Sequence, residues 1–182
     1  MYPYLEPHGL ILKINRQPLS ELSDESVQRD HDYWVKYVTP MIGDWLNNDT
    51  PVSAVAAFAE KTHLKKDFNG FAGDRRFVEN DYSQKMFSKL RSSIAGVFVW
   101  RAQHTNDARE KQRMNDEADF AFRQAWALCP DSPEVVYQYV NLLLAENRGT
   151  DAFLVAETAS KLPGGNQFRA LVQQLRRYQK AQ

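Results

Sequence analysis

Residue types that carry catalytic or metal-binding chemistry are few in this sequence and lie far apart. The histidines stand well away from the spacing of a metal site: His8, His31, His63 and His104. The closest grouping of possible ligands is Asp30-His31-Asp32. Adjacent side chains of a helix point about 100° apart, so these three cannot converge on one ion. We therefore expect a solvated helix face here and no metal site.

Nucleophilic and acid–base groupings are also weak. Cys129 is the single cysteine, so no internal disulfide can form, and no histidine stands near it in the sequence. We expect it to be a small packed side chain. The adjacent acids Asp24-Glu25 and Asp116-Glu117 are typical of helix starts and helix faces. With no phosphate-binding glycine loop and no Gly-x-Ser-x-Gly elbow, the sequence predicts no catalytic residue, no cofactor and no metal, and an enzyme is the least supported hypothesis.

Composition places the 182-residue chain among folded proteins of one domain, or of one domain with an attached module. Its 23 Lys and Arg residues balance its 23 Asp and Glu residues, so nothing points to nucleic acid. The basic residues of 166–182 are expected on a solvated helix face. No apolar run could span a bilayer and Met1 begins no signal peptide, so the chain as given is expected to be soluble and, by default, cytoplasmic. The alternative is that Met1 is an internal methionine of a longer protein.

Three regions are predicted: an extended segment at 1–22, a helical region at 23–80 and a second helical region at 81–182. Proline and glycine punctuate the first region around one short apolar run, Leu10–Ile14, for which we find no convincing partner strand. This opening is expected to pack against the body as a tether.

Helical spacing of apolar residues marks the second region. It is interrupted at Thr39-Pro40, where the helix should kink or restart, and Thr50-Pro51 is a clear start signal. Residues 67–74 form a glycine-rich loop, and its aromatic residues, Phe68 and Phe71, are expected to fix it to the core. A ligand-binding loop is the alternative.

The third region contains an internal repeat. Ala118 and Ala125 map onto Ala152 and Ala159 at a shift of 34 residues. Positions with this spacing lie on one helical face, and small alanine side chains let a neighbouring helix approach closely. We infer two consecutive copies of one helical unit.

The first copy reads Ala118-x3-Phe122-x2-Ala125-x4-Pro130. This spacing resembles the second helix of the tetratricopeptide repeat (TPR), whose period is 34 residues. The resemblance covers about residues 90–164, as two repeats of which the first is irregular. It implies an all-α fold of antiparallel helical hairpins, a TPR-like superhelix with an N-terminal helical extension and a C-terminal capping helix.

One irregularity concerns length. In a regular repeat the glycine of the first helix precedes the alanine of the second by 12 residues, whereas Gly96 precedes Ala118 by 22. We infer about ten extra residues around Gln103–Gln112 that extend the helical hairpin into solvent.

The resemblance also implies a concave groove, lined by the first helix of each repeat, that binds a peptide or a partner protein. Carried onto this sequence, the best-supported groove residues are Val97, Trp100, Arg101, Glu134, Tyr137 and Asn141. Tryptophan, arginine and tyrosine are enriched at binding hot spots. Two alternatives stay open: the groove accepts a partner, or the helices of 24–66 fill it.

A second resemblance concerns the opening, Tyr4–Ile11 with Lys13–Arg16 after it. It looks like the start of the extramembrane C-terminal region of some bacterial multispanning membrane proteins similar to glycosyltransferases. The resemblance implies a structural region without catalytic residues, linked to a membrane only through an upstream segment. The sequence gives neither the partner nor the oligomeric state.

Overall fold

The computed structural model describes residues 1–180 and is mostly helical, which confirms the expected all-α class, with one small two-stranded sheet among these residues. The elements in chain order are η1 (Tyr2–Tyr4), β1 (Leu5–His8), β2 (Ile11–Ile14), α1 (Asp24–Ile42), α2 (Val52–Phe58), the π-helical η2 (Ala59–Leu64), α3 (Arg75–Val78), α4 (Asp81–His104), α5 (Ala108–Leu128), α6 (Pro133–Ala145), α7 (Gly149–Lys161), η3 (Gly165–Phe168) and α8 (Arg169–Lys180).

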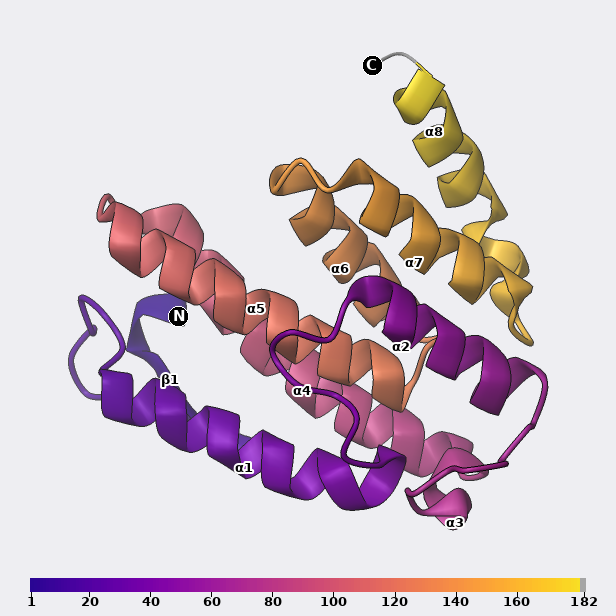
Figure 1. Ribbon diagram of the computed structural model, residues 1–182. Coiled ribbons are helices and arrows are strands. Elements are labelled where there is room, and N and C mark those ends of the chain that lie inside the picture. The colour runs from indigo at the N-terminus through magenta and orange to yellow at the C-terminus, as the bar shows by residue number, and fades with distance from the viewer. Residues whose placement is uncertain (181–182) are drawn as a thin grey trace.

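The two longest helices, α4 and α5, form an antiparallel hairpin on which the other elements pack (Figure 1). The Asn80 side chain accepts a hydrogen bond from the Ser83 amide at the start of α4. Asp107 accepts one from the Glu110 amide at the start of α5. These caps satisfy amides that have no partner in the first helical turn, so they fix where both arms of the hairpin begin.

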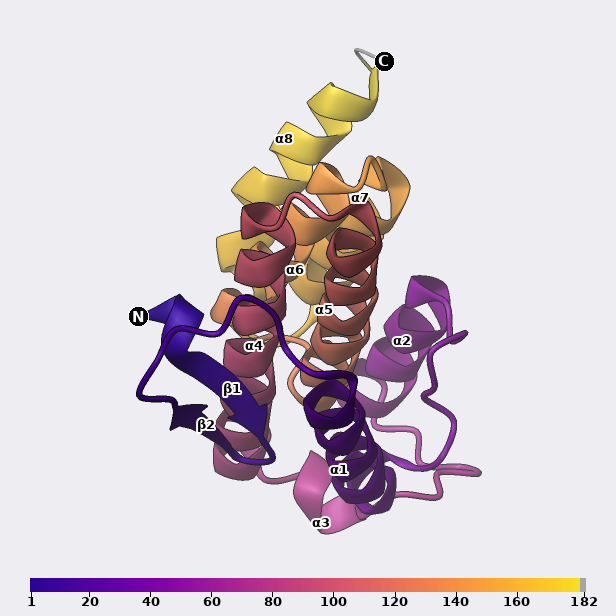
Figure 2. The ribbon, with the colours of Figure 1, turned by 90° about the vertical axis from the view of Figure 1, so that its left-hand side faces the viewer.

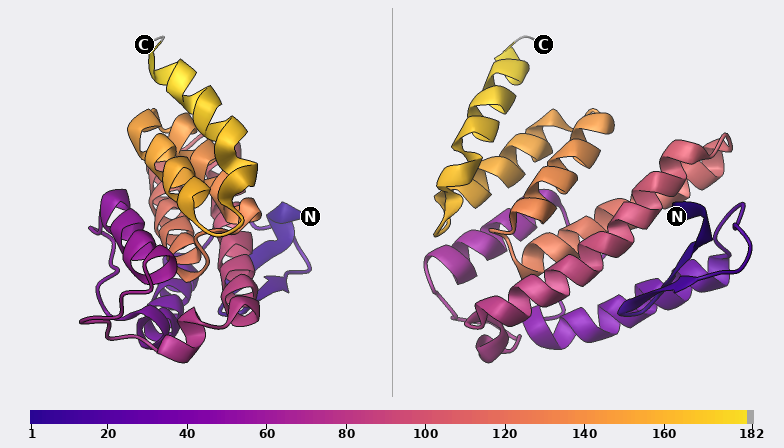
Figure 3. Two further views of the ribbon diagram at one scale, coloured as in Figure 1. Left: turned by 90° about the vertical axis from the view of Figure 1, so that its right-hand side faces the viewer. Right: turned by 180° about the vertical axis from the view of Figure 1, so that it is seen from behind.

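Helix α1 lies along one side of this hairpin, and α2 and the α6–α7 hairpin lie along the other (Figures 1 and 3). Helix α1 continues through Pro40 to Ile42, so the expected interruption at Thr39-Pro40 is a helix end two residues later. Gly43 follows with φ of 98°, a backbone conformation that favours glycine. Proline is tolerated because it stands in the last turn rather than in the middle of the helix.

The opening segment is a hairpin rather than a lone strand, so the expectation of an unpartnered strand is wrong. β1 pairs antiparallel with β2, with Leu5 opposite Ile14 (Figure 2). Gly9 has φ of 66° in the two-residue turn that joins them. The partner strand, Leu5–His8, was not recognised in the sequence because it contains Pro7. Proline argues against a strand, since it occurs in sheets only at edges and at positions whose amide is not needed.

The interior holds a fully buried ion pair where a solvated helix face was expected. Asp30 of α1 accepts a hydrogen bond from Arg91 of α4 at 2.7 Å, and both side chains are completely buried. Arg91 also donates to Gln124 of α5 at 2.7 Å. The prediction of a solvated face at Asp30-His31-Asp32 is therefore wrong for Asp30, which pairs with the arginine that joins three helices. It is also wrong for His31, whose ring stacks on Phe120 and lies 3.3 Å from Glu117.

The C-terminal elements pack in sequence, α6 on α7 and α7 on α8 (Figure 3). Val172 and Leu175 are buried on the inner side of α8. At the opposite end of the fold, Phe68 and Phe71 lie partly buried against the core, as expected for a loop fixed by its aromatic residues. No helix within residues 1–180 combines the length and the apolar character that crossing a bilayer requires.

Candidate functional site

A cleft of about 590 Å³ lies between α4, α5 and α6. It exists because α4 and α5 are 24 and 21 residues long, whereas α6 has 13, so the α4–α5 hairpin extends beyond α6. Figure 3 shows the free end of this hairpin diverging from α6 and α7. Two residues of the segment Gln103–Gln112, Gln103 and Lys111, line this cleft.

The polar lining of the cleft is mainly carboxamide. Its polar side chains are Gln103, Lys111, Asn115, Gln138, Asn141 and Glu146. Gln138 and Asn141 are exposed on successive turns of α6, facing Lys111 and Asn115 on successive turns of α5. A carboxamide presents a donor and an acceptor together, as a peptide unit does. The floor is apolar and includes Val99, Phe122 and Leu142.

Trp100 stands at the rim of the cleft inside an aromatic stack. The Tyr2 ring lies parallel to it at 5.7 Å between centroids, and the His104 ring lies on it at 4.2 Å. His104 Nδ1 also lies 2.8 Å from the carbonyl oxygen of Trp100, one turn earlier. The residue that covers Trp100 thus comes from the opening segment, not from the helices of 24–66.

The predicted groove residues divide into three groups. Trp100 and Asn141 line the cleft together. Tyr137 and Glu134 are exposed on α6 but outside it, and the Tyr137 ring packs on Phe168 at 5.9 Å between centroids.

Val97 and Arg101 are buried, so no partner can reach them in this structure. The Arg101 guanidinium donates to the carbonyls of Leu19, Pro3 and Leu5 at 3.1, 3.2 and 3.4 Å. Burial lowers the pKa of Arg101, with Glu110 and Glu6 acting in the opposite sense. Arg101 thus holds the opening segment on α4.

Five of the six polar lining residues were not predicted from the sequence: Gln103, Lys111, Asn115, Gln138 and Glu146. The spacing of Lys111 and Asn115, one helical turn apart in the extra segment, was a usable signal. It was not decisive, because spacing on one helix does not reveal which other helix it faces.

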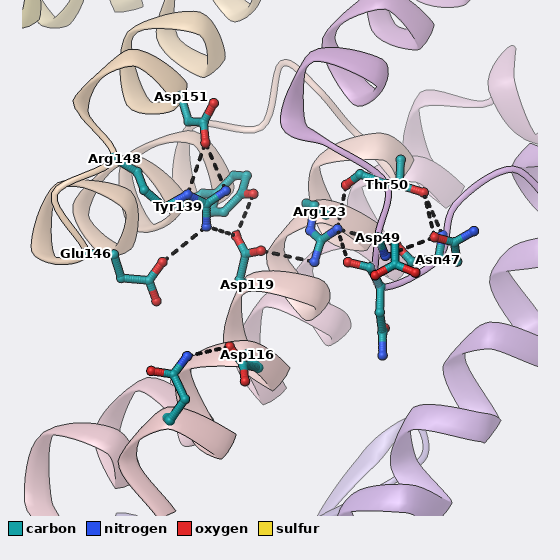
Figure 4. Close-up of polar contacts among 12 residues, drawn as sticks. Asn47, Asp49, Thr50, Asp116, Asp119, Arg123, Tyr139, Glu146, Arg148 and Asp151 are labelled. Atoms are coloured by element: carbon teal, nitrogen blue, oxygen red, sulfur yellow. Dashed lines mark hydrogen bonds and ion pairs between the residues drawn. The ribbon is translucent and has the colours of Figure 1, made fainter. Parts of the chain in front are cut away.

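An ionic network beside the cleft fixes α6 on α5 (Figure 4). The Asp119 carboxylate of α5 accepts a hydrogen bond from the Tyr139 hydroxyl at 2.8 Å. It also pairs with Arg123 and with Arg148, each at 3.0 Å. Arg148 in turn pairs with Glu146, a residue of the cleft wall, at 3.1 Å. The network therefore sets the position of this wall.

The electrostatics of the network follow from its burial. Desolvation raises the pKa of Glu146; the hydrogen bond from Arg148 opposes this, and the charge of Asp119 reinforces it. Burial is the largest single effect on the pKa of Arg148 and lowers it, but the charges of Asp119 and Tyr139 and the hydrogen bonds to Asp151 and Glu146 together outweigh it, so the pKa is raised. Arg123 connects the network to the 47–50 loop by donating to the Asn48 carbonyl at 2.9 Å.

A smaller cavity of about 190 Å³ lies at the opposite end of α4, beside His63 and Asp131. Burial, reinforced by Lys66, lowers the pKa of His63 to about 4, so this imidazole is neutral at pH 7. Burial also raises the pKa of Cys129, and its thiol donates to Asp131 at 3.3 Å, which agrees with a packed, unreactive cysteine. Among residues 1–180, no three histidine, cysteine or acidic residues are grouped so that they could hold a metal ion.

Comparison with known family models, curated proteins and solved structures found no match to this chain.

Proposed function

We propose that this chain is a non-catalytic helical-repeat module that binds an extended segment of a partner polypeptide in the cleft between the α4–α5 hairpin and α6. The observation that carries the proposal is the set of carboxamide side chains on both walls of a 590 Å³ cleft. Such a volume falls in the range of specific ligand pockets.

The carboxamides are free to make these contacts. The side chains of Asn115, Gln138 and Asn141 make no hydrogen bond within residues 1–180, whereas the neighbouring Asp119, Arg148 and Glu146 are paired with one another. An extended peptide carries unpaired amide and carbonyl groups along its length. Paired with carboxamides, these groups are recognised with little dependence on side-chain sequence.

Trp100 supplies the apolar part of the site. It is half-buried in the cleft lining, and the part of its ring that Tyr2 and His104 leave exposed adds apolar contact area for the bound segment. The α4–α5 and α6–α7 hairpins stand side by side, which supports the resemblance to tetratricopeptide repeats on which the proposal also draws.

A library of linear peptides displayed on phage tests the proposal. The protein is immobilised, enriched peptides are synthesised with a fluorophore, and their binding is measured by fluorescence anisotropy. We expect peptides that lose affinity for Asn141→Ala and for Trp100→Ala. The matched control is Gln174→Ala, an exposed carboxamide on α8 outside the cleft, which should leave affinity unchanged.

Two outcomes would overturn the proposal. One is that no peptide is enriched over a blank surface. The other is that every enriched peptide binds Asn141→Ala, Trp100→Ala and the wild-type protein equally, because binding would then occur elsewhere.

A further inference from the structure

The N-terminal hairpin leaves a strand edge and several apolar side chains uncovered. Ile11 and Ile14 of β2 are 63% and 69% exposed, although the two residues point to opposite faces of the sheet. The described sheet contains only β1 and β2, and β1 lies between β2 and the helices (Figure 2). β2 therefore presents its outer edge to solvent with apolar residues on both faces.

The main-chain groups on this edge can be identified from the register. The Asn15 amide donates to the Tyr4 carbonyl at 2.8 Å, and Leu5 stands opposite Ile14. In an antiparallel pair, hydrogen-bonded and non-hydrogen-bonded residue pairs alternate. The amides and carbonyls of Ile11 and Lys13 thus face β1, and those of Leu12 and Ile14 face outward.

We propose that two copies of this chain associate by antiparallel pairing of β2 with β2 across a two-fold axis, with Leu12 opposite Leu12 of the second copy. A two-fold axis perpendicular to the sheet pairs residues of the same face. With Leu12 at the centre, outward main-chain groups of the two copies meet and exchange two hydrogen bonds. The same register places Ile14 beside Leu10 of the second copy, so apolar side chains meet on that face.

Neighbouring registers are less favourable. A register centred on Lys13 sets two ammonium groups opposite each other, which destabilises a strand pair. One centred on Ile11 moves Ile14 past the turn of the second copy, opposite its His8, and loses the contact with Leu10. The central register instead sets Lys13 opposite Ile11.

Charge also permits this pairing. Lys13 is the only charged residue of β2, and its ammonium is paired with Glu6 of β1 at 3.0 Å. The two copies therefore bring no uncompensated strand charges together. The result is a four-stranded sheet, which removes an exposed edge from a two-stranded hairpin that is marginal alone. The contact is small, so we expect a weak, concentration-dependent dimer.

Sedimentation velocity over a range of protein concentrations tests for the dimer. Ile14→Lys adds charge at an exposed position, so the monomer should keep its unfolding curve. We expect its dissociation constant to rise about 100-fold, because the symmetry removes two buried isoleucines at once. The control is Tyr82→Lys, an exposed apolar residue on α4, which should leave association unchanged.

Disulfide trapping tests the register in a Cys129→Ser background. Leu12→Cys should cross-link to itself on oxidation, because directly opposite Cβ atoms about 5 Å apart reach disulfide distance with a small shift of the two strands. Ile11→Cys and Lys13→Cys should cross-link with each other in a mixture but much less with themselves.

The proposal is wrong if the protein stays monomeric at every concentration, or if a dimer forms that Ile14→Lys does not weaken. It is also wrong if a monomer sediments with vesicles of anionic phospholipid and Ile14→Lys abolishes this, because a lipid surface would then cover the edge. Cross-linking in another register would overturn the assigned pairing.

Discussion

The polar side chains around Arg91 and those around Asn141 differ in burial and in hydrogen bonding, although both regions belong to the same set of packed helices. Arg91 is completely buried, and its guanidinium reaches Asp30 and Gln124 at 2.7 Å each. Asn141 is exposed in the cleft, and its side chain makes no hydrogen bond within residues 1–180. The first region uses its polar groups to fix three helices together, whereas the second leaves them free for another molecule.

The difference has an energetic basis. A buried charge without a partner costs several kcal/mol. Removing only one member of the Asp30–Arg91 pair should therefore strongly destabilise the fold. An exposed carboxamide is already hydrated, so replacing it costs the fold little. Substitutions around Arg91 should therefore lower the free energy of unfolding more than substitutions around Asn141. Peptide affinity should show the reverse, with the larger loss for substitutions around Asn141.

The largest loss of stability is expected for Arg91→Met. It leaves the Asp30 carboxylate buried without its cation, which should lower the free energy of unfolding by about 3–5 kcal/mol in urea denaturation. The double variant Asp30→Leu with Arg91→Met removes both charges and should recover most of the loss. Arg109→Met, at an exposed position of α5, is the control. A loss for the double variant as large as for Arg91→Met would contradict the ion-pair explanation.

A smaller, local loss is expected for Arg101→Met, which removes hydrogen bonds to three carbonyls of the opening segment. We expect a loss of about 2 kcal/mol. Hydrogen exchange should locate it: the Asn15 amide, bonded across the hairpin, should exchange faster, while the amides of α7 stay protected. Faster exchange throughout the chain would show that Arg101 supports the whole core instead.

Acid should weaken the same hairpin through Glu6. The hydrogen bond from Ser26 lowers the pKa of Glu6 to about 2 against the opposing effect of burial, with Lys13 and Asn15 adding to the lowering. The folded pKa is below the unfolded value of 4.5, so the stabilisation is present above pH 4.5 and is lost as the pH falls toward 2.

Urea denaturation of Glu6→Gln across this pH range provides the test. The wild-type protein should be more stable than the variant by roughly 2 kcal/mol at pH 7, and the gap should close below pH 4.5. Glu21→Gln, at an exposed position, should show no comparable gap. A gap that is constant with pH would mean that the Glu6 charge does not stabilise the hairpin.

Periodicity in the sequence was sufficient for the helices, because the apolar face of a helix repeats locally. It was not sufficient to show which turns of a helix are covered by other elements. Tyr82 and Met86 share one side of α4 with the buried Ile94, yet they are 74% and 46% exposed. Whether a turn of α4 is buried depends on where the neighbouring elements end, and the residues around Tyr82 and Met86 carry no information about that.

The candidate site was predictable only in part for the same reason. Trp100 and Asn141 were identified from the helices that carry them, and both line the cleft. Arg101 was expected on the same surface, but the opening segment, about 80 to 100 positions earlier in the chain, covers it. A contact between residues so distant in sequence leaves no local pattern to read.

The smallest effect on stability is expected for Asn141→Ala, and this variant tests the comparison most directly. Its free energy of unfolding should stay within about 0.5 kcal/mol of the wild-type value, because the side chain is exposed and unpaired. Its affinity for a peptide selected on the wild-type protein should fall about 5-fold, the effect of one lost hydrogen bond of about 1 kcal/mol. Anisotropy titrations beside urea denaturation measure both quantities, with Gln174→Ala as the matched control. If Asn141→Ala instead unfolds as easily as Arg101→Met, its carboxamide supports the fold, and the two polar regions do not differ in the way the structure indicates.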